Sequence, residues 1–180
     1  MNGSSIIIGV SGGIAAYKVA DLCSQLRKKE WDITVAMTPA AETFITPKTF
    51  QALTDNPVLI QRATGLVDAD QVYAHLFPAV SVDVFLVAPA TANSIAKIAH
   101  GFADDPVCSA ALALKPSCRK IFAPAMNTQM WNQPSVSHNC ALLRERDWTQ
   151  VGPEEGSLAC GMQGDGRLAD LSHIIATIIG

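Results

Sequence analysis

Short runs of apolar residues, many of them β-branched, alternate along the chain with longer segments of helical periodicity. The apolar runs at 6–10, 33–37, 82–88 and 121–123 predict four strands. Helices are expected from the first run to about residue 30, after residues 90 and 104, and at 135–146 and 170–179. Strands that alternate with helices favour a parallel sheet with right-handed crossovers.

The run at 82–88 is apolar at consecutive positions 84–87, which is typical of a strand buried on both faces. Helices must then cover both sides of the sheet. We therefore predict an α/β protein, a flavodoxin- or Rossmann-like three-layer α/β/α fold with a mostly parallel sheet.

Length and composition narrow the class of protein. The 180 residues fit a single domain, 1–180, in which the glycine-rich segment at about 152–168 has no apolar period and is expected to be a mobile loop. Hydrophobic residues make up 49% and charged residues 16%, which favours burial of surface in an oligomer. The net charge is −3 and the basic residues are scattered, so nucleic-acid binding is not expected.

Neither a membrane span nor a secretory signal is expected. No apolar stretch approaches about 18 residues, and the chain runs from Met1 into a strand without a basic segment or a small-residue cleavage site. We expect a cytoplasmic protein. Its five cysteines form no Cys-x-x-Cys pair, which disfavours both a disulfide framework and a zinc site, and no metal is predicted.

The predicted strands lead into loops of small polar residues, and in such a sheet these loops converge on one crevice. Ser11, Gly12, Gly13 and Ile14 place a hydroxyl and unobstructed backbone N–H groups before a helix, which suits a phosphate. A tight strand-to-helix turn explains the same residues without a ligand. The chain lacks the Gly-x-Gly-x-x-Gly and Gly-Lys-Ser/Thr patterns here, so a mononucleotide fits better than NAD or ATP.

Two further loops repeat this pattern. Thr38 follows the second strand, and the loop after the third strand adds hydroxyl and amide groups that could contact phosphate, ribityl or ring atoms; its residues are Thr91, Ala92, Asn93 and Ser94. Each of these residues is equally explained as a helix cap.

Residues 124–131 place Ala125, two methionines and a tryptophan around Asn127. Met130 and its neighbours could cover a flavin ring or a substrate arm, and Asn127 could donate to a carboxylate. A cation in that place would stabilise the carboxylate and oppose its loss as CO2. Core packing and a helix cap are the alternative explanation.

Residues 157–167 combine Cys160, several glycines and Arg167, a pattern that predicts a lid. Cys160 could deliver a thiol proton and Arg167 could hold a phosphate. An irregular loop with an incidental cysteine remains the alternative. His75 lies among apolar residues and could be a base near the crevice or a packed core residue.

Four motifs together resemble those of the homo-oligomeric flavin-containing cysteine decarboxylases, over nearly the whole chain. They are Ser-Gly-Gly-Ile-Ala-Ala-Tyr-Lys at 11–18, Ala-Pro-Ala-Thr-Ala-Asn-Ser at 88–94, Pro-x-Met-Asn-x-x-Met-Trp at 124–131, and Ala-Cys-Gly-x-x-Gly-x-Gly-Arg at 159–167. The chain departs from the family pattern at 103–106 and 168–171, away from the expected catalytic positions.

The resemblance implies FMN at the first three loops, Asn127 on the substrate carboxylate, His75 as base and Cys160 as proton donor. It also implies a homotrimer or homododecamer, and 4'-phospho-N-pantothenoylcysteine, a coenzyme A precursor, as substrate. The expected reaction oxidises the substrate thiol to a thioaldehyde, loses CO2 and reduces the resulting ene-thiol to 4'-phosphopantetheine. A peptidyl-cysteine decarboxylase, a flavin prenyltransferase and a non-catalytic flavoprotein regulatory subunit are the alternatives.

Overall fold

The computed structural model of the protein describes residues 4–61, 79–157 and 163–180. Its main sheet has six strands, all parallel, in the order β3-β2-β1-β4-β5-β6. These strands are β1 (Ser5–Val10), β2 (Asp32–Met37), β3 (Val58–Leu59), β4 (Val84–Ala90), β5 (Arg119–Pro124) and β6 (Trp148–Gln150).

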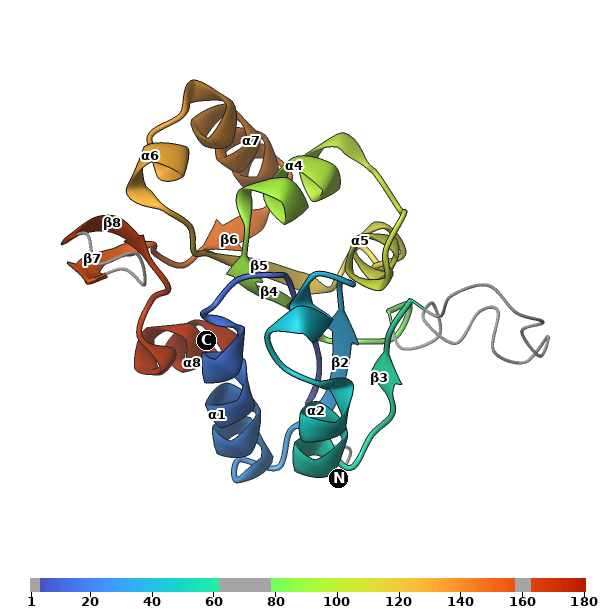
Figure 1. Ribbon diagram of the computed structural model, residues 1–180. Coiled ribbons are helices and arrows are strands. Elements are labelled where there is room, and N and C mark those ends of the chain that lie inside the picture. The colour runs from blue at the N-terminus through green and yellow to red at the C-terminus, as the bar shows by residue number, and fades with distance from the viewer. Residues whose placement is uncertain (1–3, 62–78, 158–162) are drawn as a thin grey trace.

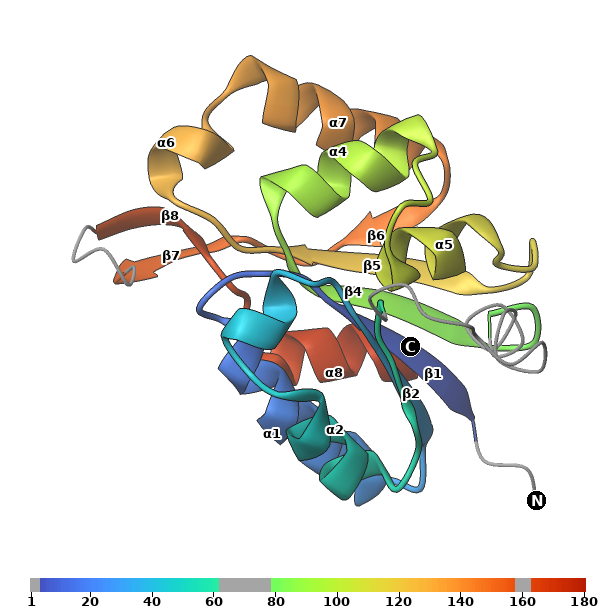
Figure 2. The ribbon, with the colours of Figure 1, turned by 45° about the vertical axis from the view of Figure 1, so that its right-hand side comes forward.

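Helices cover both faces of this sheet (Figures 1 and 2). One layer holds α1 (Ala16–Arg27), α2 (Pro47–Thr54) and α8 (Leu171–Ile179), together with the short 3-10 helix η1 (Ala41–Thr43) near the end of β2. The other layer holds α4 (Ala92–His100), α5 (Pro106–Leu112) and α7 (Pro134–Glu145). The predicted three-layer α/β/α fold with a parallel sheet is confirmed.

Alternation along the strands divides the core into two clusters. In β1, Ile6 and Ile8 pack with α1 and α8, whereas Ile7 packs with the opposite layer. All seven residues of β4 are buried, as the continuous apolar run predicts. Burying an isoleucine side chain contributes about 1.5–3 kcal/mol, so these alternating strands fix which helices lie on which face.

The segment at 152–168 is more regular than its composition predicts. Strands β7 (Glu154–Ser157) and β8 (Gln163–Arg167) form an antiparallel hairpin that projects beside α6 (Thr128–Trp131), as Figure 1 shows. The expectation of a loop did not include these two paired strands; that the segment is mobile stays a prediction. Pairing through the backbone does not require apolar side chains, and Gly156 lies opposite Gly164 in the register.

Two strands of the main sheet were not predicted, because β3 and β6 are only two and three residues long. Among the helices of the described residues, none combines the length and the apolarity needed to cross a lipid bilayer.

The order of the strands places a crevice at the carboxyl ends of β1 and β4. From β1 the chain continues through β2 to one edge of the sheet, and it returns to β4 on the other side of β1. Loops that leave two such strands diverge toward opposite layers, and open parallel sheets bind ligands at this position.

Gly12 is required at the end of β1 because the loop after β2 lies against it. A Cβ atom on Gly12 would overlap the Cβ of Ala40 and lie 2.8 Å from its carbonyl carbon. A Cβ on Gly13 would meet Thr91 Cγ2 at 3.7 Å, an ordinary contact. The two adjacent glycines therefore differ in how much space surrounds them.

We expect Gly12→Ala to lower the free energy of unfolding by about 1–3 kcal/mol, the usual cost of forcing an extra methyl group into a packed site. Gly13→Ala is the matched control and should have a much smaller effect. Urea unfolding of both variants measures the difference, and equal midpoints would contradict the close contact at Gly12.

Candidate active site

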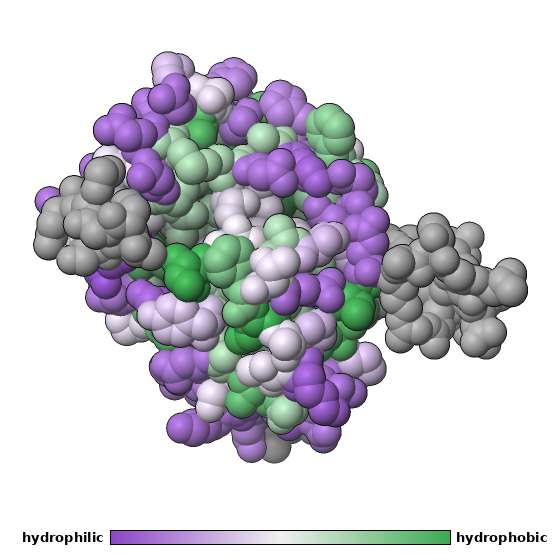
Figure 3. Space-filling view, in the orientation of Figure 1, coloured by the Kyte–Doolittle hydropathy of each residue, from purple (hydrophilic) through white to green (hydrophobic). Residues whose placement is uncertain are grey.

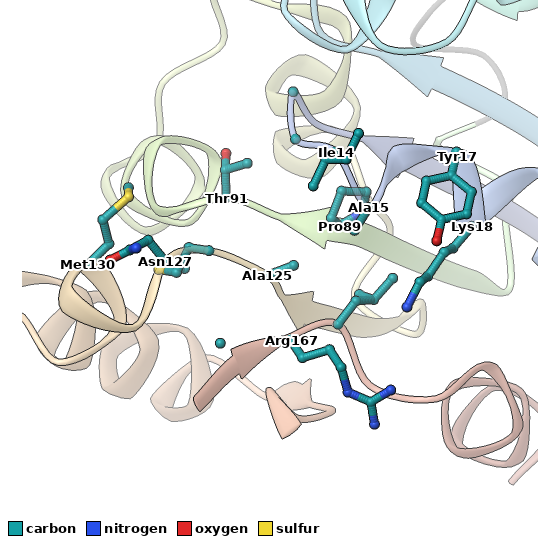
Figure 4. A pocket seen from close by; sticks show the side chains of 15 residues that line it. Ile14, Ala15, Tyr17, Lys18, Pro89, Thr91, Ala125, Asn127, Met130 and Arg167 are labelled. Atoms are coloured by element: carbon teal, nitrogen blue, oxygen red, sulfur yellow. The ribbon is translucent and has the colours of Figure 1, made fainter. Parts of the chain in front are cut away.

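A cavity of about 550 Å³ opens at the crevice between β1 and β4 (Figure 4). The loop after β1 and the start of α1 form one wall, and residues at the end of β4 and after β5 form the next. The end of β8 completes the lining with Gly166, Arg167 and Leu168. Four segments that are distant in the sequence thus meet at one place.

Ser11 ties the ends of β1 and β4 together beneath this cavity. Its hydroxyl donates to the carbonyl oxygen of Pro89 at 2.5 Å and accepts the N–H of Thr91 at 3.1 Å. Ser11 is fully buried and does not line the cavity, so its hydroxyl is committed to the fold. Thr91 lines the cavity and caps α4 by accepting the N–H of Ser94 at 3.3 Å.

The loop before α1 presents backbone donors to the cavity. Gly12, Gly13, Ile14 and Ala15 line it, and within the described residues their N–H groups have no hydrogen-bond acceptor. Unsatisfied N–H groups at the N-terminus of a helix form a binding site for an anion, because the helix dipole has its positive end there.

The other predicted cofactor contacts lie elsewhere. Thr38 is buried, and its hydroxyl accepts the N–H of Ala41 at 3.3 Å. Ala92, Asn93 and Ser94 form the first turn of α4 outside the lining, where Asn93 is exposed and Ser94 is buried. Of the predicted cofactor residues, the structure brings together Gly12, Gly13, Ile14, Thr91 and Ala125.

Asn127 lies in the cavity lining and also caps a helix. Its Oδ1 accepts the N–H of Gln129 at 2.8 Å at the start of α6. Because Oδ1 of Asn127 accepts this bond at the helix end, Nδ2 is the atom of the side chain that can donate a hydrogen bond. Met126 and Met130 line the cavity as well, whereas Trp131 packs against the core of the α4 and α7 layer.

Arg167 reaches the cavity, but its charge is already paired. Nη2 lies 2.6 Å from Glu154 Oε2, and Nη1 lies 3.1 Å from Asp170 Oδ1. Figure 4 shows the guanidinium pointing away from Asn127 and Thr91. A phosphate would therefore meet a guanidinium whose positive charge two carboxylates already offset.

Sequence reasoning missed two side chains that line the cavity, Tyr17 and Lys18 in the first turn of α1. Lys18 is half-buried, and no carboxylate in the described part of the chain pairs with its ammonium group. Tyr17 and Lys18 follow Gly13 by about one helical turn, and this spacing could have identified them as cavity-lining residues. His75 and Cys160 lie outside the described residues.

The remaining cysteines are buried and free, as predicted: Cys23, Cys108, Cys118 and Cys140. Burial raises the pKa of Cys23 to about 12 and that of Cys118 to about 11. Cys108 approaches Asp104 and Asp105 closely enough to share a metal ion. Lys97, however, pairs with both carboxylates, and Asp105 caps α5 through the N–H of Cys108, so these groups have ordinary structural partners.

The sequence matches the Flavoprotein family over residues 1–180. A probable phosphopantothenoylcysteine decarboxylase from Streptococcus mutans is 48% identical, and the alignment covers 96% of each chain. The coenzyme A biosynthesis bifunctional protein CoaBC from Escherichia coli is 41% identical over 96% of this chain, which spans 42% of that protein.

Two solved structures extend the comparison. A cysteine-to-serine variant of PPC decarboxylase complexed with pantothenoylaminoethenethiol has a TM-score of 0.87 and 26% identity, covering 98% of this chain and 97% of that one. The FMN-dependent cysteine decarboxylase SpaF has a TM-score of 0.79 and 31% identity, covering 98% and 95%. The chain therefore belongs to the flavoprotein family that includes the phosphopantothenoylcysteine decarboxylases.

Proposed function

We propose that this protein binds FMN and decarboxylates 4'-phospho-N-pantothenoylcysteine to 4'-phosphopantetheine, a step of coenzyme A biosynthesis. The main support for this proposal is that the N–H groups before α1, Lys18 and Asn127 all line one cavity. A relative named for this activity is 48% identical over nearly the full length of both chains, which supports the same assignment.

The cavity fits a flavin mononucleotide in its chemistry. Residues 12–15 offer N–H groups to a phosphate, and Ile14, Pro89 and Met126 offer apolar walls to a ring. When bound, FMN would take two electrons from the substrate thiol and return them after CO2 has left. The chain's own residues bind the substrate, orient it and move its protons.

Asn127 is proposed to hold the substrate carboxylate through its amide nitrogen. A neutral donor orients the carboxylate without adding the attraction of a full positive charge, so it does not oppose loss of CO2. Lys18 is proposed to bind the substrate phosphate, because Arg167 is already paired with two carboxylates. His75 as base and Cys160 as proton donor complete the proposal from the sequence.

The assembly and location follow from the same proposal. We propose a single domain that forms a homotrimer or homododecamer in the cytoplasm. Ile14, Tyr17 and Met130 line the cavity yet expose 57%, 58% and 46% of their surface, which supports a second subunit at its rim. Figure 3 shows that apolar and weakly polar side chains gather in the middle of the face seen in Figure 1, with mostly hydrophilic ones around them.

Asn127→Asp should keep the fold and the flavin but abolish turnover. Aspartate caps a helix as well as asparagine does, so α6 should persist. A like charge facing the substrate carboxylate should cost at least the roughly 2–5 kcal/mol lost when a charged group is left without its partner. Assays of CO2 release measure this loss. Asn132→Asp adds the same charge at an exposed position outside the lining, and equal losses in both variants would remove Asn127 from the site.

Lys18→Met should raise KM for the phosphorylated substrate about tenfold or more, since a hydrogen bond to a charged group contributes about 1.5–3 kcal/mol. The KM for unphosphorylated N-pantothenoylcysteine should change little, because that substrate has no phosphate to bind. Lys28→Met, at the exposed end of α1, is the control. An equal rise in KM for both substrates would show that Lys18 does not bind the phosphate.

Cys160→Ser should bind FMN and substrate but stall after CO2 is lost. A serine hydroxyl is a far weaker acid than a thiol, whose ordinary pKa is about 8.5, so protonation of the ene-thiol should fail. Mass spectrometry under anaerobic conditions should find a decarboxylated product with two hydrogens fewer than 4'-phosphopantetheine. Normal product at the wild-type rate would exclude Cys160 as the donor.

A further inference from the structure

An ion-pair cluster lies at the base of the β7–β8 hairpin, and Glu154 is at its centre. Its Oε2 accepts from Arg167 at 2.6 Å, and its Oε1 accepts the N–H of Asp170 at 3.1 Å. The same oxygen lies 2.8 Å from Nδ1 of His173, which must donate because a carboxylate can only accept. Glu154 therefore connects the start of β7 to the end of β8 and to the first turn of α8.

The cluster is more than a chance surface contact, because the hairpin has a glycine where the side chain of Arg167 crosses it. Arg167 crosses directly over Gly156, where a Cβ would lie 2.8 Å from Nε and 2.9 Å from Cδ. Nε is buried and has no hydrogen-bond partner among the described residues, a cost that a freely moving side chain would avoid. The path of Arg167 is therefore specified by its two carboxylate partners.

Glu154 keeps its charge in this position. Burial alone would raise its pKa, but the N–H of Asp170, the bond from His173 and the charge of Arg167 outweigh burial and hold the pKa below its usual value. Its side chain is 23% exposed, and a network of several partners at partial burial holds geometry better than an isolated surface pair does.

The far side of β8 holds the segment that carries Asn127. The N–H of Met126 donates to the carbonyl oxygen of Gly166 at 3.0 Å, and the hydroxyl of Thr128 donates to that of Asp165 at 2.7 Å. Gly166 has a φ of +129°, and a Cβ there would overlap the carbonyl oxygen of Met126. Asn127 is thus fixed by β8 at the residue before it and at the residue after it.

We propose that Glu154 is a positioning residue for Asn127, acting through β8 from outside the cavity. The proposal rests on the proposed function, in which Asn127 orients the substrate carboxylate. A two-stranded hairpin is marginally stable by itself, so the place of β8 depends on what ties it to the rest of the protein. Glu154 links β8 to α8 through its bonds to Arg167, Asp170 and His173. The hydrogen bonds from Met126 and Thr128 to β8 then position residues 126–128.

Glu154→Gln in the FMN-loaded enzyme tests this, with Glu155→Gln as the matched control. Glu155 is the next residue of the same strand, is exposed, and forms no ion pair in the described part of the chain. Hydrogen exchange should become faster at the amide of Met126 and in β8 of Glu154→Gln, and stay unchanged in β1 and β4. The control should match the wild type throughout.

Kinetics supply the second measurement. With 4'-phospho-N-pantothenoylcysteine, kcat of Glu154→Gln should fall roughly tenfold or more, since small displacements of an orienting group are costly to the reaction. The FMN affinity should stay at the value of the control, because residues 12–15 lie on a different wall of the cavity.

Unchanged exchange at Met126 would overturn the link between the hairpin and the Asn127 segment. Faster exchange with an unchanged kcat, or a loss of kcat matched by Glu155→Gln, would overturn the positioning role. If the wild-type enzyme does not convert the substrate, the proposed function fails and the kinetic role of Glu154 fails with it. Exchange at Met126 still decides the structural link in that case.

Discussion

The hydroxyl of Ser11 holds the carboxyl ends of β1 and β4 together, and the cavity is built around that contact. It donates to the carbonyl oxygen of Pro89 in β4 and accepts the N–H of Thr91, so this fully buried group bonds to the end of the neighbouring strand. The loop after β1 is thereby fixed just where the strands separate toward opposite layers. The hydrogen bonds of Ser11 therefore help to position the N–H donors of residues 12–15 and Thr91, the residue that caps α4.

The opposite wall has a different origin. Residues 125–130 leave β5 and lie against β8, whose own position depends on the charged cluster around Glu154. One wall is thus part of the central sheet, and the other is held by a two-stranded hairpin. In the proposed function, the N–H groups of the first wall hold the phosphate of FMN, and the substrate lies between Lys18 on that wall and Asn127 on the second.

Most of the fold could be predicted from the sequence because short apolar runs mark the central strands and helical segments alternate with them. The short strands β3 and β6 carry too few apolar residues to be recognised, and the β7–β8 hairpin pairs through glycine-rich backbone. In the site, the sequence identified Gly12, Gly13 and Asn127 from residue type. It could not tell whether a hydroxyl such as that of Ser11 faces a ligand or a neighbouring carbonyl. The ion pair of Arg167 with Glu154 was equally hidden, because Glu154 lies thirteen positions away.

The proposed function is tested most directly by conversion of 4'-phospho-N-pantothenoylcysteine by the purified wild-type protein. We expect a yellow protein whose visible spectrum is that of bound FMN, and equal amounts of CO2 and 4'-phosphopantetheine released without an added oxidant or reductant. A protein that carries FMN but releases no CO2 from this substrate would contradict the proposed function. A protein that cannot be loaded with FMN would contradict the assignment of the cavity as well.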